Sequence, residues 1–250
     1  IDSEFGTPDE LRSLTSQFDV YTDAILNHVG FHHPIATHFF NDPENFSGNV
    51  FSFGTPPNLV ESKNHRGHPK VNPFQIGNRT WYIWQSFDPS QIDIDLRSKY
   101  VRDQIDRYMS FLSSLGVFGV RLDAPSYYAK TPDQPQRHHP GSISLARAIA
   151  EQVSNHKLSL FAQLDCDDNG SSYFPESAGF KVPIYDFAYS PLLILSILVE
   201  NPNFLHAHLL GHLCRSPLVL RAPRTHDGIM LRSSNLLQND ASKLERYAES

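Results

Sequence analysis

The sequence predicts an α/β fold in which parallel strands alternate with helices. Five strand-like segments are separated by segments of helical length or helical periodicity in a chain of 250 residues. Strands that alternate with helices at this spacing are typical of parallel βαβ units, and an α/β barrel of this length usually forms one domain. A closed (β/α) barrel has eight strands, three more than are counted here.

The first element is expected to be a helix that begins after Thr7. Thr7 is a good N-cap, Pro8 suits the first helical position, and Glu10 completes a capping box. Its expected buried stripe is Leu11, Leu14 and Phe18.

A strand is predicted next, over Phe18–His28, because β-branched and aromatic residues are frequent there. This strand ends in the polar residues Asp23, Asn27 and His28.

Residues 29–97 have no helical or strand periodicity over most of their length and are rich in Pro, Gly, Asn and His. A loop of this length inside a compact domain is usually functional or a subdomain of its own. Arg79–Phe87 could form a strand within it. Trp81 and Trp84 would then either stack on a ring-shaped ligand or fill the small core of the subdomain.

Regular structure is expected to return at Ser98, which is placed as the N-cap of an amphipathic helix that Gly116 ends. The apolar stripe of this helix is Val101, Ile105, Tyr108, Leu112 and Leu115.

The central strand follows, and its side chains alternate between two faces. Phe118, Val120 and Leu122 fall on one face, and Gly119, Arg121 and Asp123 fall on the other. An Arg-x-Asp pair inside an apolar strand is costly unless the two groups pair or meet a ligand. Because Pro125 ends the strand, Asp123 lies at its C-terminal end, where barrel enzymes carry catalytic groups. A structural ion pair that closes the strand end is the alternative.

The rest of the chain predicts three more strands and three more helices. In chain order they are a helix at Ile143–His156, a strand at Leu158–Leu164, a strand at Val182–Ala188, helices at Pro191–Val199 and Leu205–Leu213, and a strand at Pro217–Ala222.

Three polar groups outside this pattern are expected to have ordinary roles. His208 and His212 have a spacing that can bind zinc, but packed or solvated histidines are favoured over a metal site. Asp93 and Asp95 are expected to form a solvated acidic pair, and Asp186 is expected to be structural.

Composition and charge describe an ordinary globular protein. The chain is 40% hydrophobic and 19% charged, and its net charge of −6 argues against a nucleic-acid surface. The two cysteines form no disulfide or metal framework. No signal peptide is recognised and the longest apolar run, Pro191–Val199, is too short to span a bilayer. A cytoplasmic location without membrane association is the default expectation.

Three polar motifs are present at Asp23-Ala-Ile-Leu-Asn-His28, Gly119-Val-Arg-Leu-Asp-Ala124 and Thr225-His-Asp-Gly-Ile229. They resemble the first, second and fourth sequence regions of the α-amylase superfamily (glycoside hydrolase family 13). The residues of these motifs are most similar to those of sucrose phosphorylase and related glycoside phosphorylases. Further support comes from the stretches at 84–95, 123–130 and 185–191.

The resemblance implies a partial (β/α)8 TIM barrel that contains about strands 3 to 7, with an irregular subdomain inserted after strand 3. Residues 1–28 and 98–250 would be the barrel portion, and residues 29–97 the insert, similar to the family's domain B. Strands 1, 2 and 8 have no counterpart, so a fragment or a degenerate gene product is expected.

The resemblance also implies retaining glucosyl transfer by double displacement. Asp123 matches the nucleophile that forms a glucosyl ester, and Asp227 matches the transition-state stabiliser. The substrate-binding residues would be His28, Arg121, His226 and Asp23. An oxocarbenium-like transition state needs such a carboxylate, a second carboxyl group and hydrogen bonds to the sugar. The family needs no metal or other cofactor.

Gln163 departs from the family pattern. Alignment on the strand at Leu158–Leu164 places it where the acid/base Glu belongs. An amide cannot donate a proton at neutral pH, and losing general acid catalysis typically costs on the order of 10² to 10⁴ in rate. Asp165 lies roughly 6–7 Å further along the strand, a poor substitute position.

The predicted activity is phosphorolysis of sucrose or a similar α-glucoside to glucose 1-phosphate. The partners would be an α-glucoside with a fructose or small polyol aglycone and inorganic phosphate. The alternatives are an α-glucoside hydrolase of the same family, or a catalytically impaired sugar-binding relative in which Gln163 prevents turnover.

Overall fold

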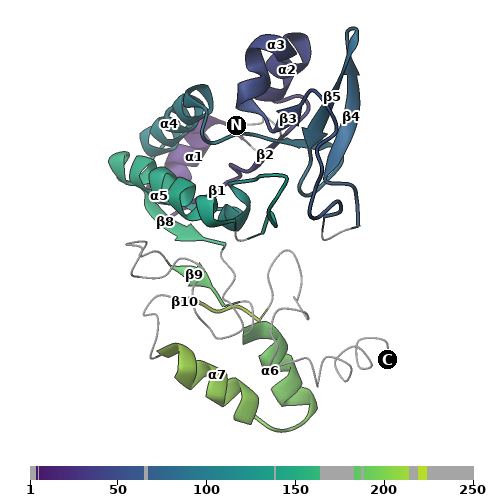
Figure 1. Cartoon of the computed structure of the whole chain (residues 1–250). Helices are drawn as coiled ribbons and strands as arrows, with labels where there is room; N and C mark the ends of the chain where they lie inside the picture. Colours follow the sequence, from purple (N-terminus) through teal and green to yellow (C-terminus); the bar gives the residue numbers. More distant parts are fainter. Residues whose placement is uncertain are drawn as a thin grey trace. The chain divides into compact units, whose positions relative to one another are not determined.

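A computed structural model describes residues 4, 6–64, 67–137, 139–163, 183–186, 189–213 and 219–223 (Figure 1). The chain divides into two compact units, residues 1–161 and 162–250. The candidate site is built mainly by the first unit. No helix in the described ranges combines the length and the apolar character needed to cross a membrane.

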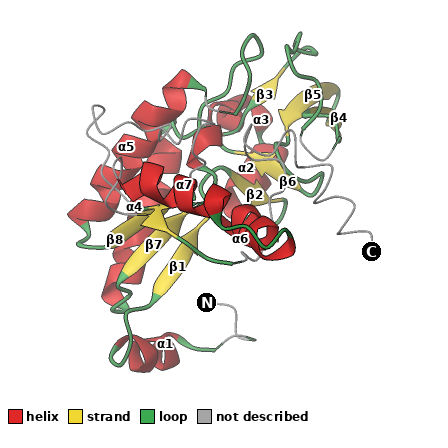
Figure 2. Ribbon diagram, turned by 90° about the horizontal axis from the view of Figure 1, so that it is seen from below, coloured by secondary structure: helices red, strands yellow, loops and turns green. Residues whose placement is uncertain are grey.

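Parallel strands form the centre of the first unit. They are β1 (Tyr21–Ala24), β7 (Gly119–Leu122) and β8 (Ser159–Ala162), adjacent in that order, and Figure 2 shows them side by side. β1 pairs with β7 so that Asp23 lies opposite Arg121. All four residues of β7 are buried, as expected for a parallel strand covered on both faces.

Helices α4 (Lys99–Ser114) and α5 (Pro140–Asn155) supply the connections between these strands. Ser98 caps α4, and Gly116 follows it with φ of +74°, a conformation that favours glycine. Both features confirm the predictions, although Met109 takes the buried place expected for Tyr108.

The first helix, α1 (Pro8–Thr15), has the predicted capping box between Thr7 and Glu10. Its expected buried stripe is wrong. α1 has no buried residue, and Leu14 and Phe18 are exposed. The caps depend only on neighbours in the chain, whereas burial needs a packing partner, which the described part of the structure does not place over α1.

The strand predicted at Phe18–His28 is two strands. β1 ends at Ala24, and β2 (His28–Gly30) pairs antiparallel with β6 (Gln91–Asp93). Asn27 separates them because its fully buried amide is hydrogen-bonded to side chains from later in the chain.

The expectation that residues 29–97 lack regular structure is also wrong. Besides β2 and β6, this segment contains α2 (Pro34–Asn41), α3 (Pro43–Phe46), a 3₁₀ helix η1 (Ser47–Asn49), β3 (Ser52–Phe53), β4 (Val71–Ile76) and β5 (Arg79–Trp84). β3, β5 and β4 form an antiparallel sheet in that order. Trp81 and Trp84 are buried, and Trp81 packs edge-on against Phe39, so both fill the core.

The second unit contains α6 (Tyr189–Leu198), α7 (Asn203–Leu213) and two short parallel strands, β9 (Ile184–Tyr185) and β10 (Val219–Leu220). Ala162, at the end of β8, pairs with Ile184. All five predicted parallel strands are therefore present, and the chain is a partial (β/α) barrel.

Asp186 lies at the end of β9 and is almost completely buried. It accepts hydrogen bonds from His208 (2.8 Å) and Arg221 (3.1 Å). His208 is therefore packed against a carboxylate, in agreement with the structural roles expected for both residues.

Candidate active site

The candidate site lies at the C-terminal ends of β1 and β7. The buried guanidinium of Arg121 uses one nitrogen, Nη1, to donate to Asp23 Oδ1 at 2.9 Å and to Asp123 Oδ1 at 3.3 Å. Asp23 and Asp123 flank this cation from two neighbouring strands. Sequence reasoning left open whether Arg121 and Asp123 pair with each other or meet a ligand. The structure shows that they pair and that Asp23 joins them.

The backbone around Asp123 holds its carboxylate at the strand end. The Asp123 amide donates to the carbonyl of Ala24 at 3.2 Å, which extends the β1–β7 pairing by one residue. Ala124 then has φ of +43° and begins the 3₁₀ helix η2 (Pro125–Tyr127). Left-handed backbone at a residue other than glycine costs on the order of 1–3 kcal/mol and is concentrated at functional sites.

A buried tyrosine lies close to the same carboxylate. Burial raises the pKa of Tyr128 well above its usual range, and the Asp123 carboxylate adds to the rise. The Tyr128 hydroxyl has no hydrogen-bond partner among the described residues. Tyr128 is fully buried and therefore stays neutral near the Asp123 carboxylate.

His28 borders the site as the first residue of β2. Burial lowers the pKa of His28, and the carboxylates of Asp93 and Asp123 partly oppose that shift. Its ring packs against Phe87 with centroids 5.1 Å apart, and Phe87 packs against Tyr127 at 5.1 Å. Sequence reasoning did not single out these two aromatic residues, because single aromatic residues outside a periodic pattern carry no distinctive signal.

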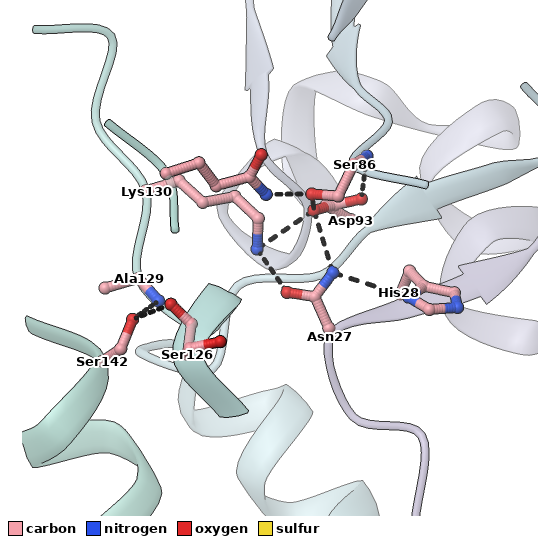
Figure 3. A network of polar contacts seen from close by, with 9 residues as sticks. Asn27, His28, Ser86, Asp93, Ser126, Ala129, Lys130 and Ser142 are labelled. Carbon is pink, nitrogen blue, oxygen red and sulfur yellow. Dashed lines mark hydrogen bonds and ion pairs between the residues drawn. The ribbon is translucent and has the colours of Figure 1, made fainter. Parts of the chain in front are cut away.

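A buried polar network lies behind His28 (Figure 3). Lys130 Nζ is 2.8 Å from Asn27 Oδ1 and 3.1 Å from Asp93 Oδ2, and both charged side chains are fully buried. The expectation that Asp93 is solvated is therefore wrong. Asp95 is paired instead with Arg97, at 2.7 Å. The difference arises because Asp93 meets a cation from a loop that follows β7, a contact that local sequence does not reveal.

The other predicted site residues are Gln163, His226 and Asp227. Gln163 follows β8 directly and is partly buried, in the second unit. His226 and Asp227 lie outside the described residues, as does Asp165. Among the described residues no group of three His, Cys, Asp or Glu side chains could hold a metal ion.

The chemistry that this arrangement can support is that of a carboxylate nucleophile. Arg121 stabilises the ionised form of Asp123 and limits its rotation, so that a carboxylate oxygen is presented at a fixed position. A nearby neutral imidazole and aromatic faces are groups that commonly hold a sugar ring.

The profile of one family, described as the alpha-amylase catalytic domain, matches residues 1–161. Two curated proteins are similar. Glucosylglycerol phosphorylase of Marinobacter adhaerens is 28% identical over 92% of this chain and 49% of its own length. Sucrose phosphorylase of Bifidobacterium adolescentis is 24% identical over 92% of this chain and 46% of its own length.

A solved structure resembles the chain over almost its whole length. The sucrose 6F-phosphate phosphorylase of Thermoanaerobacter thermosaccharolyticum has a TM-score of 0.86 at 21% identity, and the match covers 98% of this chain and 52% of that one. The chain thus spans about half the length of these relatives. The fold, the strand-end carboxylate and the family match over residues 1–161 lead to one conclusion: the chain belongs to the α-amylase catalytic-domain family.

Proposed function

We propose that the protein catalyses retaining α-glucosyl transfer, with Asp123 as the nucleophile. The observation that carries this proposal is the position of Asp123 at the end of β7, where Arg121 Nη1 contacts its carboxylate. Asp123 would attack the anomeric carbon while the bond to the aglycone oxygen breaks, and the product would be a glucosyl ester. A second nucleophile would then displace Asp123 and restore the original configuration.

Inorganic phosphate is the proposed second nucleophile, and glucose 1-phosphate the product. The names of the relatives support this choice, because those described above are phosphorylases of sucrose, its phosphate or a glucosyl polyol. Sucrose or a similar α-glucoside is accordingly the proposed donor. Water as acceptor, which would make the protein a hydrolase, is an outcome that the assay distinguishes.

The other proposed site roles rest on the resemblance of the sequence motifs to those of the family. His28, Asp23, Arg121 and His226 would bind the sugar, and Asp227 would stabilise the transition state. We also propose that residues 29–97 are the inserted subdomain. The antiparallel pairing of β2 with β6 supports this, since it brings the two ends of that segment together.

Gln163 favours a second candidate function, sugar binding without turnover. In the first step the leaving oxygen needs a proton, and an amide at position 163 cannot supply it. The nucleophile and the sugar-binding groups would then still hold glucose, but the glucosyl ester would form very slowly.

One experiment separates the two candidates. Glucose 1-phosphate and free glucose are both measured with sucrose and phosphate for the protein, for Gln163→Glu and for Gln163→Glu combined with Asp123→Asn, while calorimetry measures glucose binding. Turnover by the unaltered protein supports transfer and requires a proton donor other than Gln163. Turnover only after Gln163→Glu supports the second candidate, in which the unaltered protein binds sugar without turnover. If Gln163→Glu still reacts after Asp123→Asn is added, the proposed nucleophile is wrong. If neither the protein nor Gln163→Glu reacts, the proposed donor or the integrity of the site fails, and the sugar-binding candidate is favoured.

A further inference from the structure

A continuous series of polar contacts leads from a buried cation to the candidate sugar-binding histidine (Figure 3). It begins at Lys130, whose ammonium contacts Asn27 Oδ1 at 2.8 Å and Asp93 Oδ2 at 3.1 Å. It continues from the Asn27 amide to His28. The four residues come from the β1–β2 connection, from β2, from β6 and from the loop after η2.

Lys130 determines how the Asn27 amide is oriented. An ammonium only donates hydrogen bonds, so the Asn27 atom that faces it must be the carbonyl oxygen. The amide nitrogen of Asn27 is then directed to Asp93 Oδ2, at 3.1 Å, and to His28 Nδ1, at 3.5 Å. A flipped amide would place its N–H₂ against the ammonium and its oxygen against a carboxylate, which is electrostatically unfavourable at both ends.

Asp93 is itself held on its other side. The Ser86 amide donates to Asp93 Oδ1 at 2.9 Å, and the Ser86 hydroxyl donates to Oδ2. Gln136 donates in turn to the Ser86 hydroxyl oxygen. Because Asp93 cannot rotate freely, the Asn27 amide has one orientation that satisfies all its neighbours.

The orientation of Asn27 has a consequence for His28. An amide N–H₂ group is a donor only, so Nδ1 of His28 must accept, and a neutral ring that accepts at Nδ1 carries its proton on Nε2. The neutral ring is consistent with the lowered pKa of buried His28, although the carboxylates of Asp93 and Asp123 favour protonation.

We propose that Lys130 is a positioning residue that acts through Asn27 to hold His28 as the neutral Nε2–H tautomer. His28 then offers a hydrogen-bond donor to an oxygen of the bound sugar. The tautomer is a property of the ligand-free protein, and only its use in sugar binding rests on the function proposed above.

The test is ¹⁵N NMR of the protein labelled at histidine, without ligand, with the His28 signal identified by its loss in His28→Gln. We expect one protonated nitrogen, Nε2, and one unprotonated nitrogen, Nδ1. In Lys130→Met, which removes the cation but keeps much of the volume, we expect this single pattern to be replaced by a mixture of tautomers. The double variant Lys130→Met with Asp93→Asn leaves no unpaired buried charge, and we expect the same mixture in it.

The matched control is Lys70→Met. Lys70 is also a buried lysine paired with a carboxylate, that of Glu61, and among the described residues its ammonium has no hydrogen bond or ion pair with Asn27, His28 or Asp93. We expect Lys70→Met to leave the His28 pattern unchanged. If the effect of Lys130→Met came only from a general loss of stability, Lys70→Met would change the pattern as well.

Two results would overturn the proposal. One is an Nδ1–H tautomer, or a protonated ring, in the unaltered protein at neutral pH. The other is a His28 pattern that is the same in the folded double variant as in the unaltered protein. Sugar affinity is measured in parallel, and misplacement of His28 is expected to weaken it on the order of 10- to 100-fold. If the tautomer shifts as expected but no variant binds sugar, the proposed function fails while the role of Lys130 stands.

Discussion

Two clusters of opposite charges in the first unit differ in how far water reaches them. Lys130 and Asp93 have fully buried side chains, at 0% exposure each. In the other cluster Arg121 is buried, whereas the side chains of Asp23 and Asp123 are 50% and 20% exposed. The first cluster therefore has no access to a ligand, while the second presents carboxylate oxygens to one.

The difference separates the tasks of the two clusters. Buried charges that lose their partner are strongly destabilising, so Lys130 and Asp93 lock the segments that carry His28. A cluster with one open side is worth little to stability, and its charges remain available for chemistry. The following substitutions test this division.

The largest expected effect is on catalysis at the open cluster, which is formed by Asp23, Arg121 and Asp123. Asp123→Asn should lower glucosyl transfer on the order of 10⁴-fold or more in any form of the protein that turns over, because the amide is not a nucleophile. Rates of glucose 1-phosphate formation measure it. Asp103→Asn, on the exposed face of α4, is the control. Equal rates in the two variants would contradict the role of Asp123.

The largest expected effect on stability is at the sealed cluster, which is formed by Lys130 and Asp93. Asp93→Ala should lower the free energy of unfolding by about 3–5 kcal/mol, because it leaves the Lys130 ammonium buried without its counter-ion. Denaturant unfolding measures the change. Asp103→Ala, which breaks an exposed pair with Lys99, should change it by less than about 1 kcal/mol. A similar small change for Asp93→Ala would show that the cluster is not sealed in solution.

Gly119 tests the packing of the strand that carries the open cluster. A Cβ atom there would lie 2.6 Å from the carbonyl oxygen of Ser159 and 2.5 Å from the Tyr21 ring. Gly119→Ala should therefore cost about 1–3 kcal/mol, the usual range for overpacking. Gly48→Ala is the matched control, since nothing lies within 4 Å of its Cβ position. A thermal shift no larger than that of the control would contradict this packing.

A smaller stability effect is expected when the open cluster loses its exposed carboxylate. Asp23→Asn should change the free energy of unfolding by less than about 1 kcal/mol, because Asp23 is half exposed and Arg121 keeps its contact with Asp123. Sugar affinity, measured by calorimetry, should nevertheless fall. A loss of stability as large as that of Asp93→Ala would remove the distinction between the two clusters.

The smallest effect expected is a pH dependence that arises at His28, between the two clusters. Burial lowers the pKa of His28 from about 6.5. Just below that pH, His28 is therefore protonated to a greater extent in the unfolded chain than in the folded chain. The stability associated with His28 is thus present above about pH 6.5 and is lost as the pH falls through the lowered pKa.

His28→Gln should therefore reduce the loss of unfolding free energy between about pH 7 and about pH 5. It should not abolish that loss, because burial lowers the pKa of His33 and His139 as well. Denaturant unfolding at both pH values measures the difference. An unchanged or steeper pH dependence in His28→Gln would mean that His28 is not buried as described.

Features that depend on neighbouring residues could be read from the sequence. The N-caps Thr7 and Ser98, the end of α4 at Gly116 and the strand β7 are all decided within a few residues, and all are present. The stripe of α1 was not predictable in this way, because an apolar periodicity states which side chains would be buried only if a partner covers them.

The features of the candidate site can be divided in the same way, into those set by neighbouring residues and those set by tertiary contacts. The sequence by itself determined the alternation of strands and helices, the position of Asp123 at a strand end, the placement of Arg121 on the same face of that strand and the amide at Gln163. Each of these follows from local pattern or from motifs that are continuous in the chain.

Only the tertiary structure decided which distant groups meet. Lys130 contacts Asn27 across 103 positions, and Asn27 contacts Asp93 across 66. Whether Asp93 is solvated or sealed depends on that encounter, since the same carboxylate is stable in water alone and in the interior only beside a cation. A charge in a sequence has no fixed role until folding selects its partner and its distance from water.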